Sequence, residues 1–288
     1  MKFLFCVLRV LCGERLLLEE RIMRPKLVMS SNPMAVKEDD VTFSIMSGFD
    51  GVDWSFARDR VPLENRSKVR FISQVRRLQD HDIEVRFHTP FLNTEIGHHD
   101  DKIAQWAMEL HLRTLELVAE AGGEFLTLHI GLGSVPDEEI SRTKVHENLT
   151  ALKAFGLSHG VTISLENLMH GPTSFPEEWI EILEQVDIPA TFDFGHAKGC
   201  LAVVKGLWTP MEMVCQVKER LNHAHIYKEE NGEGHIPPET IDDLGIDLLD
   251  ALLETSCRWW VVELAEKKAA LHTKELLEIY IEPSLGGA

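Results

Sequence analysis

The chain of 288 residues has few cysteines, and they follow no pairing pattern. No two of them form a Cys-x-x-Cys motif and their number is odd, so neither a zinc ribbon nor a disulfide framework is indicated. We interpret them as reduced thiols and expect a cytoplasmic protein. The five are Cys6, Cys12, Cys200, Cys215 and Cys257.

The sequence also lacks an apolar run long enough to cross a membrane. Its first residues resemble a signal peptide only faintly, because Arg9 interrupts the apolar stretch and no small-x-small cleavage site follows. We expect residues 1–22 to be an N-terminal extension without an assigned role, either an extra strand or helix or an artefact upstream of Met23. Residues 23–288 are expected to form one domain.

Basic residues are scarce as well. The chain has 29 Lys and Arg against 47 Asp and Glu, which gives a formal net charge of −18. Such a field repels polyanions, so nucleic acid is not an expected partner unless a local basic or metal-lined patch works against it. The apolar fraction of 44% and the charged fraction of 26% are ordinary for a globular protein.

Two short β-type runs in the middle of the chain each end in a carboxylate. Residues 161–166 (VTISLE) end in Glu166, and residues 190–193 (ATFD) end in Asp193, with His196 three residues further on. Strand alternation puts the apolar residues of each run on one face and the small polar residues and the acid on the other. This pattern is typical of a (β/α)-barrel, whose strands face helices on one side and the barrel interior on the other.

The same strand-then-helix pattern is repeated along the whole chain. Strands are expected at 25–31, 48–56, 83–91, 124–133, 161–167, 189–193, 221–227 and 258–263. Helices are expected at 33–47, 62–81, 101–121, 146–160, from 176 onward, at 239–256 and at 267–280. Strands that alternate with helices imply a parallel sheet, and eight of them imply closure. The predicted fold class is therefore α/β, a single (β/α)8 TIM barrel.

Six successive expected strands, the third to the eighth, place a metal-competent side chain at the C-terminal rim of the barrel. These side chains are His88, His129, Glu166, Asp193 with His196, His225 and Glu263. Taken singly, such a His is more often structural and such an acid often caps a helix. Unrelated structural roles would not all fall at the end where barrel enzymes keep their chemistry. We interpret Glu166, Asp193, His225 and Glu263 as a divalent-metal site for Mn, Zn, Co or Mg.

Other side chains leave alternatives open. Further ligands or residues that hold substrate hydroxyls are expected among His88, His129, His196, His223, Glu233 and His235. Trp54 and Phe56, at the end of the second strand, are expected to form an apolar wall for a sugar face. Arg86 is expected to make an internal ion pair with Asp53 or Glu84, and Trp259 to lie inside the barrel.

A set of motifs in order along the chain resembles a known family. The motifs are FHTPFLN at 87–93, LTLHIGLG at 126–133, ISLENL at 163–168, FDFGHA at 192–197, HAHIYKEENGEGHIPPE at 223–239 and VVEL at 261–264. They resemble the xylose isomerase-like (β/α)8 superfamily, which holds sugar isomerases and epimerases, inosose dehydratases and the endonuclease IV family. The resemblance implies that Glu166, Asp193, His225 and Glu263 hold the metal, with Glu166 and Glu263 as the acid/base pair.

Three functions remain open under this resemblance. The first is a metal-dependent isomerase or epimerase of a small sugar or polyol-type carbonyl compound that acts through an enediolate, with one metal and a homodimer or tetramer as candidate assemblies. The second is an endonuclease IV-type phosphodiesterase with three metals, for which Glu233-Gly-His235 stands where that family has Asp-x-His. FDFGHA replaces that family's cysteine-containing motif, which ranks this alternative lower. The third is a ligand-binding barrel without turnover.

Overall fold

Eight strands form the centre of this computed structural model, which describes residues 24–31, 37–56, 61–91, 94–131, 135–232 and 234–285. The barrel strands are β1 Lys26–Ser30, β2 Gly51–Ser55, β3 Glu84–His88, β4 Phe125–Leu128, β5 Thr162–Glu166, β6 Ala190–Asp193, β7 Leu221–Ile226 and β10 Trp259–Val262. A separate antiparallel hairpin consists of β8 Glu229–Asn231 and β9 Gly234–Ile236. The expected N-terminal extension, residues 1–22, lies outside the described residues.

The helices connect successive strands on the outside of the barrel. They are α2 Lys37–Ser47, α3 Asn65–Gln79, α4 Asp101–Glu120, α5 Arg142–Ser158, α6 Pro176–Val186, α7 Phe194–Gly199, α8 Leu201–Val204, α9 Pro210–Val217, α10 Ile246–Leu253 and α11 Lys267–Leu285. Short 3₁₀ turns are η1 Asp137–Glu139, η2 Pro172–Ser174 and η3 Ile241–Leu244.

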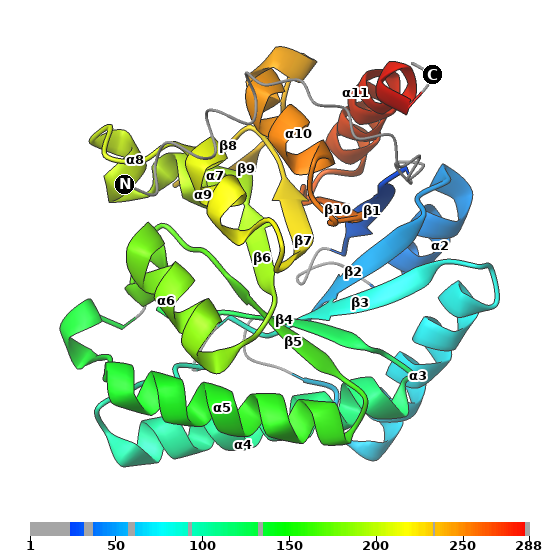
Figure 1. Cartoon of the computed structure of the whole chain (residues 1–288). Helices are drawn as coiled ribbons and strands as arrows, with labels where there is room; N and C mark the ends of the chain where they lie inside the picture. The colour runs from blue at the N-terminus through cyan, green and yellow to red at the C-terminus, as the bar shows by residue number, and fades with distance from the viewer. Residues whose placement is uncertain are drawn as a thin grey trace, which may run out of the picture.

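The sheet closes on itself in the order β1, β2, β3, β4, β5, β6, β7, β10, and every neighbouring pair is parallel. Figure 1 shows the strands at the centre with the helices around them. The predicted (β/α)8 barrel is therefore confirmed. Because all strands run the same way, their C-terminal ends meet at one rim, which is where the acids and histidines of the sequence motifs are placed.

One predicted helix is divided. We expected a single helix over 239–256, whereas the structure has η3 followed by α10. Gly245 lies between them with φ of +89°, a left-handed conformation that interrupts a helix and that favours glycine. Thr240 and Asp243 form a capping box at the start of η3, so this turn has its own N-terminal signal.

The barrel interior has a packed floor below the rim. Val28, Trp259 and Val261 form a small apolar cluster there, separate from the main core between barrel and helices. The guanidinium of Arg86 lies 4.0 Å from the ring centroid of Phe125 and 4.4 Å from that of Trp259. Its Nε donates to a carboxylate oxygen of Glu84 at 3.0 Å, which is one of the two expected ion pairs. The barrel is thus closed at its lower end, and the rim above is the place for chemistry.

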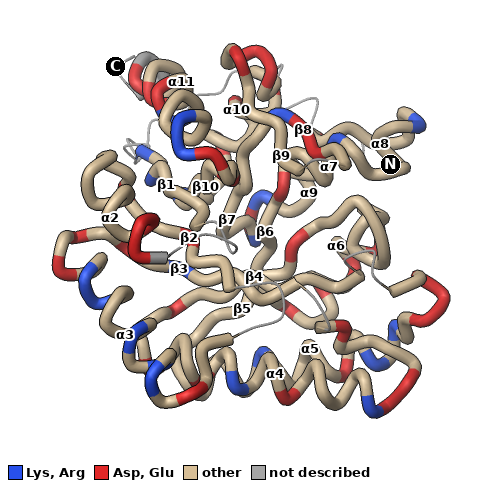
Figure 2. The backbone as a smooth tube through the Cα atoms, turned by 180° about the vertical axis from the view of Figure 1, so that it is seen from behind, with Lys and Arg blue, Asp and Glu red and all other residues tan. Residues whose placement is uncertain are grey.

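Charged residues lie mainly on the outer elements. In Figure 2, Lys and Arg are interspersed with Asp and Glu along the surface helices, while the barrel strands carry few charges. No helix in the described part of the chain is both long and apolar enough to cross a membrane.

Candidate metal-binding active site

The carboxylate of Glu166, at the end of β5, is surrounded by imidazoles. Its Oε2 lies 3.0 Å from Nε2 of His88, 3.2 Å from Nε2 of His129 and 3.5 Å from Nδ1 of His225. Its other oxygen lies 3.2 Å from Nδ1 of His196. Side chains from β3, from the residue directly after β4, from β7 and from α7 therefore meet at one acid that is 1% exposed.

Asp193 ends β6 and caps α7. Its Oδ1 accepts hydrogen bonds from the backbone N–H of His196 and from the hydroxyl of Tyr227, both at 2.7 Å. The side chain of Asn167 holds its backbone from two sides, accepting from Asp193 N at 2.8 Å and donating to Asp193 O at 3.1 Å. The Oδ2 atom is buried and has no hydrogen-bond partner among the described residues. One oxygen of this carboxylate is therefore free to take a ligand.

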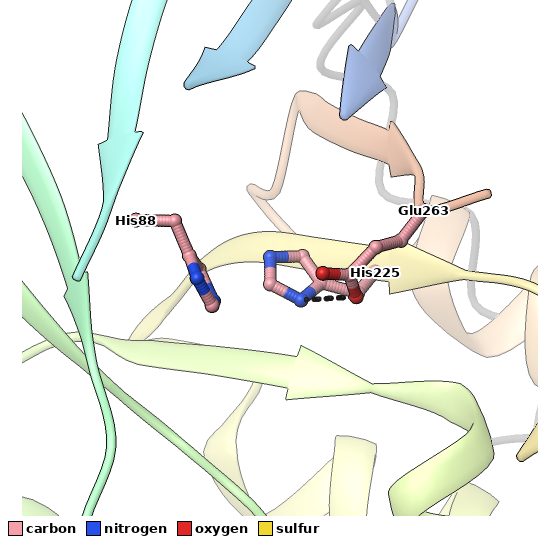
Figure 3. A group of neighbouring side chains, drawn as sticks. All are labelled: His88, His225 and Glu263. Carbon is pink, nitrogen blue, oxygen red and sulfur yellow. Dashed lines mark ion pairs between the residues drawn. The ribbon is translucent and has the colours of Figure 1, made fainter. Parts of the chain in front are cut away.

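His225 on β7 and Glu263, directly after β10, lie on neighbouring strands of the rim, and their side chains face each other (Figure 3). Nδ1 of His225 lies 3.1 Å from Oε2 of Glu263. His88 approaches from β3, with its ring centroid 5.3 Å from that of His225. Figure 3 shows the three side chains pointing toward one another.

The charges of this cluster are mutually stabilised. Burial raises the pKa of Glu166, but His225 and His129 more than offset it, so the pKa lies well below its usual range. The same two effects act on Glu263: burial raises the pKa of its carboxyl and the attraction of His225 lowers it, and the net result is a lowered pKa. Burial lowers the pKa of His225, but Glu263 and Glu166 raise it well above its usual range. These directions favour the ionised form of Glu166 and Glu263 and the protonated form of His225, so a cation that used His225 as a ligand would compete with a proton there.

Another group of ligand-type side chains, His196, Glu230 and His235, lies beside this cluster. The β8–β9 hairpin pairs Glu230 with His235, and Glu230 Oε2 lies 2.9 Å from Nε2 of His196. Nδ1 of His196 lies 3.0 Å from the carbonyl of Asn167, and Nδ1 of His235 lies 2.7 Å from the carbonyl of Glu263. A carbonyl that takes the Nδ1–H leaves Nε2 of each ring available as a ligand, the arrangement usual for metal-bound histidine.

These donors fit a divalent metal. Buried atoms without a hydrogen-bond partner in the described part of the chain include Oδ2 of Asp193, Nδ1 of His129 and Nε2 of His225. Such atoms are costly in a closed core, and a bound ion is one of the partners that can satisfy them. Ligand atoms within 4.8 Å of one another belong to the sets His88–His129–Glu166, His88–His225–Glu263, Glu166–Asp193–His196 and His196–Glu230–His235. Mixed imidazole and carboxylate donors suit Zn, Mn or Co.

The structure places the remaining expected residues as follows. His223 lies one layer below the site inside the barrel, where its Nε2 is 3.4 Å from Arg86. Burial, followed by the charge of Arg86, lowers its pKa well below the usual range, so it is a neutral interior residue. Glu233 lies outside the described residues. Glu230, which we did not predict, stands opposite His235, and only the register of the hairpin could have indicated it.

The expected apolar wall is wrong. Trp54 and Phe56 are 3% and 2% exposed, and both rings pack on Phe71 of α3, with centroids 5.3 Å and 5.6 Å apart. Side chains alternate along β2, so Asp53 and Ser55 take the inward positions and Trp54 the outward one. Both aromatic rings belong to the core between barrel and helix and not to the site.

The fold and the site together define a (β/α)8-barrel protein with a histidine and carboxylate cluster at the C-terminal rim. A family profile described as "Xylose isomerase-like TIM barrel" matches residues 46–278. The chain belongs to this family, as the resemblance in the motifs implied.

Individual proteins are also similar to this chain. An uncharacterized protein of Methanocaldococcus jannaschii is 29% identical over 161 residues, which is 56% of this chain and 68% of the relative. Among solved structures, a D-tagatose 3-epimerase-like protein has a TM-score of 0.69 at 20% identity, covering 90% of this chain and 97% of its own. A D-allulose 3-epimerase from Methylomonas sp. in complex with D-allulose has a TM-score of 0.66 at 14% identity, with the same coverage of 90% and 97%. At these identities the likeness shows the fold.

Proposed function

We propose that the protein is a divalent-metal-dependent isomerase or epimerase of a small polyhydroxylated carbonyl compound. The observation that carries the proposal is the pair of carboxylates, Glu166 and Glu263, that share His225 at the barrel rim. A bound metal would supply Lewis-acid polarisation of the substrate carbonyl. The sugar epimerases of the same fold support the substrate class by analogy.

The two acids are placed for different tasks. The Glu263 side chain is 15% exposed and that of Glu166 is 1% exposed, so Glu263 is the carboxylate that a substrate entering from the rim would meet. The lowered pKa of Glu263 keeps its carboxylate ionised, which is the form that a general base needs, although a lower pKa also makes it a weaker base. His196 and His235, at the edge of the cluster, are placed to donate hydrogen bonds to substrate hydroxyls where they are not ligands.

Metal binding is the first test. Protein purified without chelator should contain a divalent ion by elemental analysis, and Asp193→Asn and His225→Ala should each lower its occupancy. Asp187→Asn is the matched control, because this acid pairs with surface Lys153 and Arg220 far from the rim. No binding of added Mn or Zn to the wild-type protein would remove the basis of the proposal.

Proton transfer is the second test. In deuterated water, turnover of a ketose panel that includes D-tagatose and D-allulose should place deuterium on the carbon next to the carbonyl. Glu263→Gln should abolish net conversion, because an amide cannot accept the proton. Conversion without incorporation of deuterium would mean hydride transfer and would contradict the acid/base role.

A second function is favoured by one observation: three of the four candidate ligand groups are linked, because two of them share Glu166 and two share His196. Several metals in one site suit the clamping of a phosphate, as in a phosphodiesterase. The net charge of −18 opposes binding of a polyanion, and we rank this function second for that reason. Metal-dependent nicking of an oligonucleotide with one abasic site would reverse the order.

A further inference from the structure

Tyr227 lies directly after β7 and is fully buried between the ligand groups. Its hydroxyl donates to Oδ1 of Asp193 at 2.7 Å. Its ring stacks on the imidazole of His235, with centroids 4.0 Å apart and planes inclined by 7°. Gly195, in α7, makes room for it, because a Cβ on that glycine would overlap the tyrosine ring. Tyr227 therefore touches both Asp193 and His235. These two residues belong to different candidate ligand groups, Glu166–Asp193–His196 and His196–Glu230–His235.

The contact with Asp193 decides which oxygen of that acid is available. Oδ1 already accepts from Tyr227 and from the backbone of His196. Oδ2 has no hydrogen-bond partner among the residues described and lies 3.7 Å from Nδ1 of His225. The hydroxyl thus keeps the carboxylate rotated so that its free oxygen faces the cluster. Without the hydroxyl, a single donor would hold Oδ1 and the carboxylate could rotate.

The contact with His235 decides how the hairpin meets the site. The ring of His235 is held on its flat face by Tyr227 and at Nδ1 by the carbonyl of Glu263 at 2.7 Å. These two restraints fix the plane of the imidazole, and a ring nitrogen of His235 lies within 4.8 Å of ligand atoms of Glu230 and His196. The β8–β9 hairpin has only three residues in each strand, so such contacts contribute much of its positioning.

We propose that Tyr227 is a positioning residue that orients Asp193 and His235 together, so that the two groups of ligands are set by one side chain. This inference rests on the metal binding proposed above. The hydroxyl serves Asp193 and the aromatic face serves His235. Removing partners that orient metal ligands typically lowers metal affinity by about 10- to 100-fold, and we expect a loss of that size when the hydroxyl is removed.

The test uses Co²⁺ as the probe in competition with a chromophoric chelator, with absorption spectra of the Co²⁺-loaded protein as a second readout. Tyr227→Phe keeps the ring and removes the hydroxyl, and should weaken Co²⁺ binding about 10- to 100-fold and change the visible bands. Tyr280→Phe is the matched control, because its hydroxyl also bonds a carboxylate, that of Asp250, on the protein surface. It should leave both readouts unchanged.

Tyr227→Leu removes the aromatic face as well and should lower the number of Co²⁺ ions bound or weaken the additional ions beyond the effect of Tyr227→Phe. An equal effect of Leu and Phe would overturn the role of the stack. Wild-type affinity and spectrum in Tyr227→Phe, or the same loss in Tyr280→Phe, would overturn the role of the hydroxyl. A wild-type protein that binds no Co²⁺, Mn²⁺ or Zn²⁺ would instead refute the proposed function, so the two failures are distinguishable.

Discussion

Replacing Gly171 by alanine should destabilise the protein more than replacing Gly160, although both glycines have nearly the same φ, +73° and +74°. Gly171 has ψ of −168°, in a region that is essentially reserved for glycine, where another residue costs about 1–3 kcal/mol. Its added Cβ would lie 2.6 Å from Cα and 2.7 Å from O of Gly131, and such overpacking costs about 1–3 kcal/mol more.

The expected loss for Gly171→Ala is therefore about 2–6 kcal/mol of unfolding free energy. Gly160 is the second residue after α5 and has nothing within 4 Å of its added Cβ, so its substitution should cost only the left-handed conformation, about 1–2 kcal/mol. Urea unfolding of the two variants measures the difference. Equal losses would refute the argument that the two loops cross in tight contact.

This crossing also bears on the site. Gly131 follows His129 by two residues, and its N–H donates to a carboxylate oxygen of Glu95 at 2.7 Å. On the other side, the hydroxyl of Thr173 donates to the carbonyl of Ile130 at 3.4 Å. Pushing the loops apart would move His129 away from Glu166. We therefore expect Gly171→Ala to weaken metal binding as well, and Gly160→Ala to leave it unchanged.

Other variants test other parts of the structure. Burial lowers the pKa of His111 to about 4, so between pH 6.5 and 4 the unfolded chain binds more protons than the folded one and stability is lost as the pH is lowered. His111→Asn should reduce this loss by up to about 3 kcal/mol, measured by urea unfolding at several pH values. Trp54→Ala should cost about 3–5 kcal/mol of stability with no change in substrate KM. A raised KM would mean that Trp54 contacts the substrate after all. Glu230→Gln should weaken metal binding in chelator competition, whereas Glu229→Gln should not, and equal effects would contradict the assignment of Glu230.

The barrel and most of its rim could be predicted from the sequence because strand alternation has a period of two. In a parallel barrel, one face of each strand must be apolar to meet the helices, so the inward face can be identified from the residues alone. The last inward residue before each loop then lies at the rim, which is how Glu166, His225 and Glu263 were found. The same rule, applied to Trp54, should have placed that ring on the helix side, next to its inward neighbour Asp53.

In the ligand group His196–Glu230–His235, the acid Glu230 could not be predicted from local spacing, because its position depends on how a hairpin pairs. A pattern of acid, any residue and histidine suggested Glu233 and His235 as neighbours on one strand. In the structure β8 and β9 are antiparallel, and Glu230 and His235 are directly opposed across the pair. Opposed side chains of such a pair point to the same face, and here that face holds His196. The register of a hairpin is set by its turn, and a shift by one residue would turn Glu230 away from the site. The position of this acid therefore follows from the register in which β8 pairs with β9, a feature that ligand spacing alone does not reveal.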